Sequence, residues 1–282
     1  MKTVYMDFWK PNTLLKGISE IYDLDGKTII GLMKKYNNQE ELLSAFFELS
    51  GIHPDTYSLE NVLIRCKVVG KYPDTSMLQS EGLLPLTKLL MKDSYLVRFL
   101  AENGIAINVS DRFLVYQGRK IRIQDADCLG CKLYHDNGEI EAFYCASTEM
   151  MLGYSTVKEY PEILYTVDVF LKKHGYDPLG LGRKWAHRTK GFDIISFYVD
   201  LSSTTYINGC DLDYSSIWPY EEYLEGDYPY TDSYPMTLYR NLWLLKTAFG
   251  RIQGDMYSDS CLGIEVNTEI PYAELEIQHF DS

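Results

Sequence analysis

Phe192–Leu201 reads FDIISFYVDL, an apolar run rich in β-branched and aromatic residues. Its composition predicts a central β-strand, because such side chains pack well on a pleated, buried surface. Val62–Val69, with the sequence VLIRCKVV, predicts a second buried strand. The order of the elements around these two strands decides the class of fold.

Helical patterns with matching end signals lie around these strands. Asn38 opens an apolar helix that Gly51 closes, and Gly82 stands where the left-handed cap of a short helix is needed. Pro161 suits the start of another helix, where its missing N–H is not required. The expected helices are 38–51, 75–82, 85–103, 161–174 and 237–249; the expected short strands are 105–109, 113–116, 120–123, 262–266 and 275–277, with a hairpin over 132–145.

This order is mostly β with helices inserted, and it lacks the regular alternation of a doubly wound parallel sheet. The sequence therefore predicts an α+β fold. We expect residues 1–60 to form an N-terminal helical extension packed on a main domain of residues 61–282, since the chain is long enough to bury a sizeable core.

The composition narrows the classes of partner and compartment. A formal net charge of -13 argues against binding to duplex nucleic acid, whose phosphates require a basic surface. No apolar run is long enough for a membrane span, and the N-terminus lacks a signal-peptide pattern. The six cysteines show no disulfide framework. We therefore expect a cytoplasmic protein with reduced thiols.

An acidic, tyrosine-rich segment occupies residues 206–239. No Lys or Arg occurs between Gly191 and Tyr239, whereas acidic residues and eight tyrosines alternate within the segment. Long irregular insertions of this kind are often functional loops. The segment is either a recognition surface for a basic protein or a solvated loop.

Two further segments predict a site for a ribose. Tyr154, Ser155 and Thr156 place three hydroxyl groups ahead of the helix that starts near Pro161, and Glu265 lies within the short apolar strand 262–266. A carboxylate that faces inward is costly unless it has a task, and here it would stabilise positive charge at an anomeric carbon. Alternatively, Ser155 and Thr156 are turn or cap residues, and Glu265 faces solvent.

Other familiar sites are disfavoured. Cys128 and Cys131 form one close pair, but His135 and Cys145 fall on opposite arms of the expected hairpin, so a zinc site is not expected. Gly180–Lys184 follows a helix and lacks the later glycine of a phosphate loop. We therefore expect no metal.

Several short phrases, in this order, resemble ADP-ribosyltransferase-like proteins of bacteria and their phages, broad relatives of diphtheria-type and DNA-modifying ADP-ribosyltransferases. Each phrase is short, and the likeness lies in their order and in the matching helix breaks between residues 60 and 280. The phrases are Leu63–Lys67, Ser80–Leu84, Ser94–Leu100, Leu114–Gly118, Gly138–Phe143, Tyr154–Val157 with Pro161–Leu164, and Glu265 ahead of Ile270-Pro271.

The resemblance implies a split antiparallel sheet with inserted helices that binds NAD in a cleft. On the matching positions, Arg65 with its neighbour Cys66 would hold the adenosine side of NAD. Tyr154, Ser155 and Thr156 would pack on nicotinamide, and Glu265 would be the catalytic residue. The chain departs from the family's His and Thr on the first strand, where it has Arg65-Cys66-Lys67.

The interval from Glu265 to Ile270-Pro271 is also shorter than the family implies, so Glu269, or the pair Glu274 and Glu276, is an alternative catalytic carboxylate. The expected function is transfer of ADP-ribose from NAD to a macromolecular acceptor, preferably a protein, or hydrolysis of NAD. The alternatives are a non-catalytic inhibitor that uses the acidic segment 206–239 and a nucleotide-binding sensor without turnover.

Overall fold

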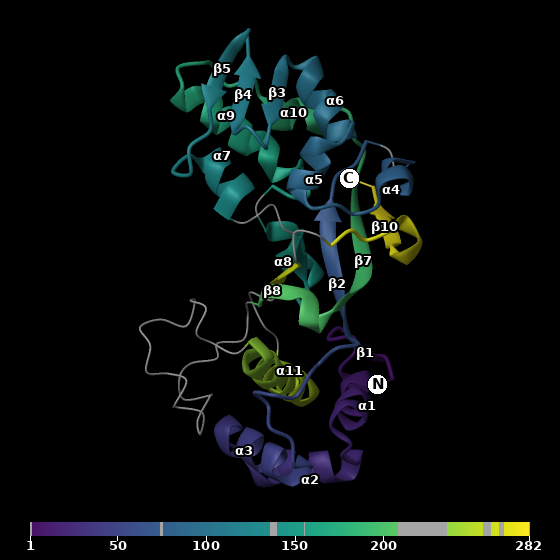
Figure 1. Cartoon of the computed structure of the whole chain (residues 1–282). Coiled ribbons are helices and arrows are strands. Elements are labelled where there is room, and N and C mark those ends of the chain that lie inside the picture. The colour runs from purple at the N-terminus through teal and green to yellow at the C-terminus, as the bar shows by residue number, and fades with distance from the viewer. Residues whose placement is uncertain are drawn as a thin grey trace. The chain divides into compact units, whose positions relative to one another are not determined.

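The computed structural model describes the chain in seven stretches, and they fold into two compact units (Figure 1). The described residues are 2–73, 76–135, 140–154, 156–207, 236–255, 261–264 and 268–281. Unit 1 comprises Met1–Cys66, Phe143–Ala146 and Tyr198–Leu262, and unit 2 comprises Lys67–Ala142, Ser147–Phe197 and Gly263–Ser282. Helices and antiparallel strand pairs occur together, which confirms the predicted α+β class.

Unit 1 is largely helical, and two of its described helices begin at side-chain caps, of which the one at Asn38 was predicted. The Asp25 carboxylate accepts hydrogen bonds from Lys27 N and Thr28 N, and the Asn38 side chain accepts from Glu40 N and Glu41 N. These bonds satisfy amides that a helix leaves unpaired at its N-terminus. The elements of unit 1 are β1 (Val4–Met6), α1 (Pro11–Tyr22), α2 (Gly26–Lys35), α3 (Gln39–Ser50), β8 (Thr204–Ile207) and α11 (Met236–Gln253).

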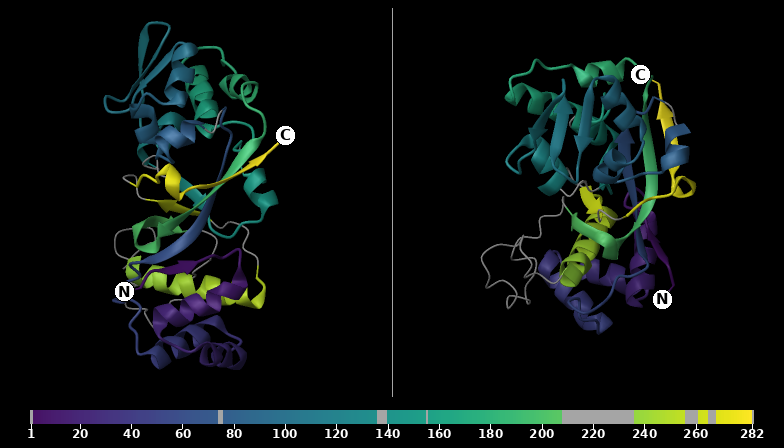
Figure 2. Two further views of the ribbon diagram at one scale, coloured as in Figure 1. Left: turned by 90° about the vertical axis from the view of Figure 1, so that its right-hand side faces the viewer. Right: turned by 45° about the horizontal axis from the view of Figure 1, so that its top comes forward.

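The core of unit 1 forms around α11, which lies beside α1 in both views of Figure 2. Trp243 of α11 is fully buried, and its ring packs against the rings of Phe8 and Tyr144. Tyr22 of α1 donates a hydrogen bond of 2.8 Å to Asn241 Oδ1 of α11. The aromatic rings thus anchor α11 in the core, and the satisfied polar pair joins α11 to α1.

Unit 2 contains a small antiparallel sheet in the order β3-β4-β5 covered by helices (Figure 1). Leu114 of β4, Phe99 of α6 and Phe170 of α9 are buried in one core with Trp185 of α10. The elements are α4 (Ser76–Glu81), α5 (Leu86–Met91), α6 (Tyr95–Glu102), β3 (Ile105–Asn108), β4 (Phe113–Tyr116), β5 (Arg119–Arg122), α7 (Cys128–Gly130), a π-helical turn (Cys131–His135), α8 (Thr148–Gly153), α9 (Glu162–Lys173), α10 (Leu181–Ala186) and β10 (Glu276–Phe280).

The larger sheet has the strand order β10-β7-β2-β6-β9-β8 among the described residues, and β1 pairs in parallel with β2. It contains the predicted central strand and the predicted buried strand, since β7 spans Phe192–Asp200 and β2 spans Val62–Gly70. Along β7 nearly every side chain is buried or half-buried, as its composition predicts. The remaining strands are β6 (Ile140–Phe143) and β9 (Cys261–Ile264).

Two predicted elements differ from the structure. Lys132–His135, expected as an arm of a hairpin, forms the π-helical turn after α7, because Leu129 and Leu133 are buried at helical spacing. The expected helix 85–103 is broken into α5 and α6, since the Ser94 hydroxyl caps a new helix by accepting from Val97 N. The turn 136–138 lies outside the described residues.

The C-terminal part of the chain is tied to the end of α4 by a two-residue antiparallel bridge within unit 2. Leu83 N donates to Ile270 O over 2.9 Å, and Ile270 N donates to Leu83 O over 3.0 Å. Gly82 has a φ of +69°, and a Cβ atom there would lie 2.5 Å from Ile270 O. Glycine is therefore required twice at this position, for the left-handed backbone and for the close approach.

We predict that Gly82→Ala lowers the free energy of unfolding of unit 2 by about 1–3 kcal/mol, because it adds backbone strain and a collision with Ile270 O. Gly118→Ala is the matched control, since Gly118 also has a positive φ, of +74°, but no atom lies within 4 Å of the position that a Cβ atom would take there. Urea unfolding measures both variants. An equal loss in the two variants would contradict the close approach at Gly82.

Candidate functional site

Arg65 lies on β2 in unit 1, with its side chain directed away from the buried residues Ile64 and Cys66. Arg65 Nη1 is 3.9 Å from Asp7 Oδ2, and the guanidinium carbon is 5.8 Å from the centre of the Tyr198 ring. Only 16% of the Arg65 side chain is exposed. A planar cation held between a carboxylate and an aromatic face is suited to binding phosphate or carboxylate groups.

Cys66 is a core residue of unit 1 in this structure. Its side chain is fully buried, and its thiol donates a weak hydrogen bond to Ile64 O over 3.6 Å. Burial raises the pKa of the Cys66 thiol well above its usual range, because the thiolate would lack solvation. The thiol is therefore a neutral packing group, and the predicted part of Cys66 in cofactor binding stays a prediction.

The hydroxyl segment lies in unit 2, where Tyr154 and Thr156 are described and Ser155 lies outside the described residues. Tyr154 is 38% exposed. The Thr156 hydroxyl donates to Tyr160 O over 3.2 Å, and Thr156 O accepts from Glu159 N and Tyr160 N. Thr156 therefore stabilises the turn that precedes α9, which is the alternative role that the sequence left open for it.

Glu265, the predicted catalytic residue, also lies outside the described residues. Of the alternative carboxylates, Glu269 forms ion pairs with Lys88 at 3.1 Å and with Lys92 at 3.7 Å. The hydrogen bond from Lys88 lowers the pKa of Glu269, so this carboxylate is charged and already has partners. Glu274 and Glu276 are exposed, on the turn before β10 and at its start.

The predicted site residues thus belong to different units. Arg65 and Cys66 are neighbours on one strand of unit 1, whereas Tyr154 and Thr156 belong to one turn of unit 2. Arg65 is held by Asp7 and Thr156 by Tyr160, so each pair is positioned by contacts within its own unit.

A group of titratable side chains in unit 2 was not anticipated from the sequence. It comprises Tyr72, Glu81, Asp193 and His279, here called the Tyr72 cluster. Burial, together with the charges of Asp193 and Glu81, raises the pKa of Tyr72 to about 12. Burial also raises the pKa of Glu81. Perturbed pKa values that coincide in one place are typical of functional sites, although structural networks also produce them.

The backbone around the Tyr72 cluster is fixed closely. The Tyr72 ring lies on the backbone of Gly70, where any Cβ atom would overlap it. Trp185 Nε1 donates to Lys71 O over 2.8 Å, which anchors the same loop to α10. The glycine was the one sequence signal for this cluster, since it marks a close approach without showing which residue approaches.

Asp193 and His279 form a cross-strand pair within this cluster. Asp193 of β7 is 1% exposed and lies opposite His279 of β10, whose Nδ1 is 2.9 Å from Asp193 Oδ1. The hydrogen bond to Asp193 raises the pKa of His279, and Asp281 lies 3.5 Å from the other ring nitrogen. The imidazolium form compensates a carboxylate that would otherwise be buried without a counter-charge. The neutral Tyr72 phenol nearby is a hydrogen-bond donor.

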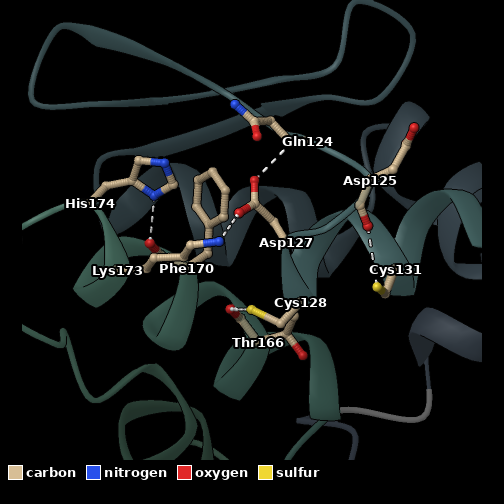
Figure 3. A network of polar contacts seen from close by, with 9 residues as sticks. All are labelled: Gln124, Asp125, Asp127, Cys128, Cys131, Thr166, Phe170, Lys173 and His174. Carbon is tan, nitrogen blue, oxygen red and sulfur yellow. Dashed lines mark hydrogen bonds and ion pairs between the residues drawn. The ribbon is translucent and has the colours of Figure 1, made fainter.

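The two cysteines of the Cys128–Cys131 pair bond to separate backbone carbonyls (Figure 3). Cys128 Sγ donates to Thr166 O over 3.7 Å, and Cys131 Sγ donates to Asp125 O over 3.3 Å. Asp127, which lies between these segments, forms an ion pair with Lys173 at 2.6 Å. Burial opposes ionisation of the Asp127 carboxyl, but the hydrogen bonds from Lys173 and from Gln124 N lower its pKa. Within the described ranges, no group of three His, Cys, Asp or Glu side chains is placed to hold a metal ion.

At the start of the Gly180–Lys184 segment, two backbone amides donate to one carboxylate of the protein. Leu179 N donates to Asp168 Oδ1 over 2.8 Å, and Leu181 N donates to Asp168 Oδ2 over 2.9 Å. One carboxylate therefore occupies the place that a phosphate would need at this turn. In the described part of the chain, no helix has the length and hydropathy to cross a membrane.

We predict that His279→Gln destabilises unit 2 in a pH-dependent way. Because folding raises the pKa of His279 above its ordinary value of 6.5, the stabilisation is fully present below pH 6.5 and is lost as the pH rises through the raised value. The difference in melting temperature between wild type and variant should therefore be larger at pH 6 than at pH 9. His187→Gln, at an exposed position of the same unit, is the control. A difference that grows with pH would contradict the pairing.

We further predict that Cys66 resists thiol reagents in the native protein, because its thiol is buried and neutral. Iodoacetamide labelling followed by peptide mass mapping should modify the exposed Cys128 and Cys131 first and Cys66 only on unfolding. Native labelling of Cys66 as fast as that of Cys131 would show that β2 opens.

Comparison of the chain with protein-family models, with curated proteins and with solved structures found no match. What the chain does is therefore inferred from its residues, from their geometry and from the resemblance described above.

Proposed function

We propose that the chain binds NAD and transfers ADP-ribose to a macromolecular acceptor, or hydrolyses NAD when water is the acceptor. The bond between the ribose anomeric carbon and nicotinamide breaks, and nicotinamide leaves with the electron pair. The acceptor nucleophile then forms the new bond to the anomeric carbon and loses a proton. A protein acceptor is favoured over duplex DNA, because the net charge of -13 repels a phosphate backbone.

The observation that carries the proposal is the bridge between Leu83 and Ile270. It joins two of the phrases that resemble the ADP-ribosyltransferases, Ser80–Leu84 and Ile270-Pro271, although they are far apart in the sequence. Three further phrases meet in the core of unit 2, where Phe99, Leu114 and Ile163 are buried together. The resemblance implies that these phrases belong to one domain, and their meeting in unit 2 supports the proposal.

The position of Arg65 adds support from unit 1. Its guanidinium is largely buried on a strand, beside Asp7 and over the Tyr198 ring, so its orientation is restricted. Arginine in such a setting binds phosphate oxygens in bidentate fashion at little entropic cost. In the proposal, Arg65 holds the adenosine side of NAD, and Glu265 stabilises positive charge on the nicotinamide ribose.

We predict that Glu265→Gln reduces nicotinamide release from NAD by roughly 100-fold or more, because it removes the charge that stabilises the transition state. Glu269→Gln is the matched control, since Glu269 is an exposed carboxylate paired with Lys88 and Lys92. Both variants and the wild type are incubated with NAD and a bacterial lysate, and released nicotinamide and labelled acceptor are measured. A larger loss in Glu269→Gln would move the catalytic role to Glu269.

The same experiment separates the two alternative functions. A rise in melting temperature with NAD but no turnover would identify a nucleotide-binding sensor. Neither turnover nor a thermal shift would contradict the NAD proposal and favour an inhibitor that binds a basic protein. The segment for that role contains Asp211, Glu221 and Asp227 without any compensating Lys or Arg, and most of it lies outside the described residues.

A further inference from the structure

The hairpin formed by β4 and β5 is basic in an acidic protein. Residues 112–123 read RFLVYQGRKIRI and contain four basic residues and no acidic one, whereas the whole chain has a net charge of -13. The turn consists of Gln117 and Gly118, which both have positive φ, of 50° and 74°. Two such residues form a tight hairpin turn whose twist matches the strands, so the register of the hairpin is fixed.

This register determines which backbone groups of β5 face outward. Tyr116 pairs with Arg119 across the turn, and Ile123 N donates to Arg112 O over 2.9 Å at the other end of the hairpin. Hydrogen-bonded pairs alternate with non-hydrogen-bonded pairs along an antiparallel ladder. Lys120 and Arg122 occupy the non-hydrogen-bonded positions, so their N–H and C=O groups point away from β4.

β5 is the terminal strand of the β3-β4-β5 sheet as far as the chain is described. Lys120 and Arg122 are exposed on the face opposite the buried Ile121, two residues apart and thus about 6.6 Å along the strand. No carboxylate among the described residues lies within 4.0 Å of Arg119, Lys120 or Arg122. By contrast, Arg98 and Arg112 of the same unit pair with Asp93 and Asp125.

We propose that the edge of β5 is a docking site for an extended acidic peptide segment of a partner protein. The segment adds a fourth strand to the sheet by pairing with the outward backbone groups of Lys120 and Arg122. Its carboxylates occur at every second residue and lie directly opposite these two side chains, where opposite charges attract. The backbone pairing supplies affinity, and the spacing of the two cations selects the acidic pattern.

An acidic peptide fits this edge better than single-stranded nucleic acid does. Single-stranded nucleic acid binds where its bases can stack on exposed aromatic rings. The aromatic ring of this face, Phe113, already has the Lys120 ammonium 4.2 Å from its centre. Single charges on edge strands also prevent unwanted pairing between sheets. Three neighbouring cations without acidic partners exceed that need; they repel basic segments and attract acidic ones.

The test uses a fluorescein-labelled seven-residue peptide that alternates glutamate with valine or threonine, and the full-length protein. We expect fluorescence anisotropy to show binding that weakens with added salt, because the charges are exposed. The double variant Lys120→Glu/Arg122→Glu should reduce the affinity roughly tenfold or more. Arg98→Gln, which removes a cation elsewhere on unit 2, should leave the affinity unchanged within about twofold.

Backbone amide shifts of the wild-type protein give an independent measurement that requires no variant. Peptide binding should shift the amides of Lys120 and Arg122 more than that of Ile121, which points toward β4. Equal binding of a peptide with its glutamates grouped together would overturn strand pairing. If the peptide does not bind, the proposal of an acidic peptide partner is wrong. Binding of an oligodeoxythymidine in place of the peptide would contradict it in the same way.

Discussion

The backbone bridge between Leu83 and Ile270 is the constraint on which the arrangement of unit 2 depends. It closes a very long loop of chain, and loop closure costs conformational entropy that has to be offset by contacts made elsewhere. Two hydrogen bonds with normal geometry would not suffice alone. The close approach at Gly82 and the pairing of Glu269 with Lys88 act on the same few residues, so the three contacts reinforce one another.

Two buried carboxylates of unit 2 are each paired with a positively charged side chain. Asp193 is buried and lies opposite His279, and Asp127 is buried and lies beside Lys173. Burying either carboxylate without a counter-charge would cost free energy, so each one holds a positively charged partner side chain beside it. At the edge of β5, by contrast, Arg119, Lys120 and Arg122 have no carboxylate within 4.0 Å in the described structure. That contrast separates charges that hold the fold from charges available to a partner.

Patterns within one element were the reliable part of the sequence. The apolar run of β7, the Asn38 cap and the left-handed Gly82 follow from side-chain chemistry over a few residues, and the structure has all three. Lys132–His135 was misread as a strand because the apolar spacing that makes it helical continues from Leu129. The Tyr72 cluster could not be predicted, since its members come from separate segments that only tertiary folding brings together. Among the predicted site residues, Arg65 lies on the expected strand, whereas Ser155 and Glu265 lie outside the described residues.

Hydrogen exchange at single amides tests the central role of the bridge most directly. If the bridge holds the C-terminal segment in unit 2, the amides of Leu83 and Ile270 should exchange together, at a rate close to that of the buried core amide of Leu114. Fast exchange of both bridge amides while Leu114 stays protected would contradict this account. It would show that unit 2 is stable without the bridge and would remove the main structural support for the proposed function.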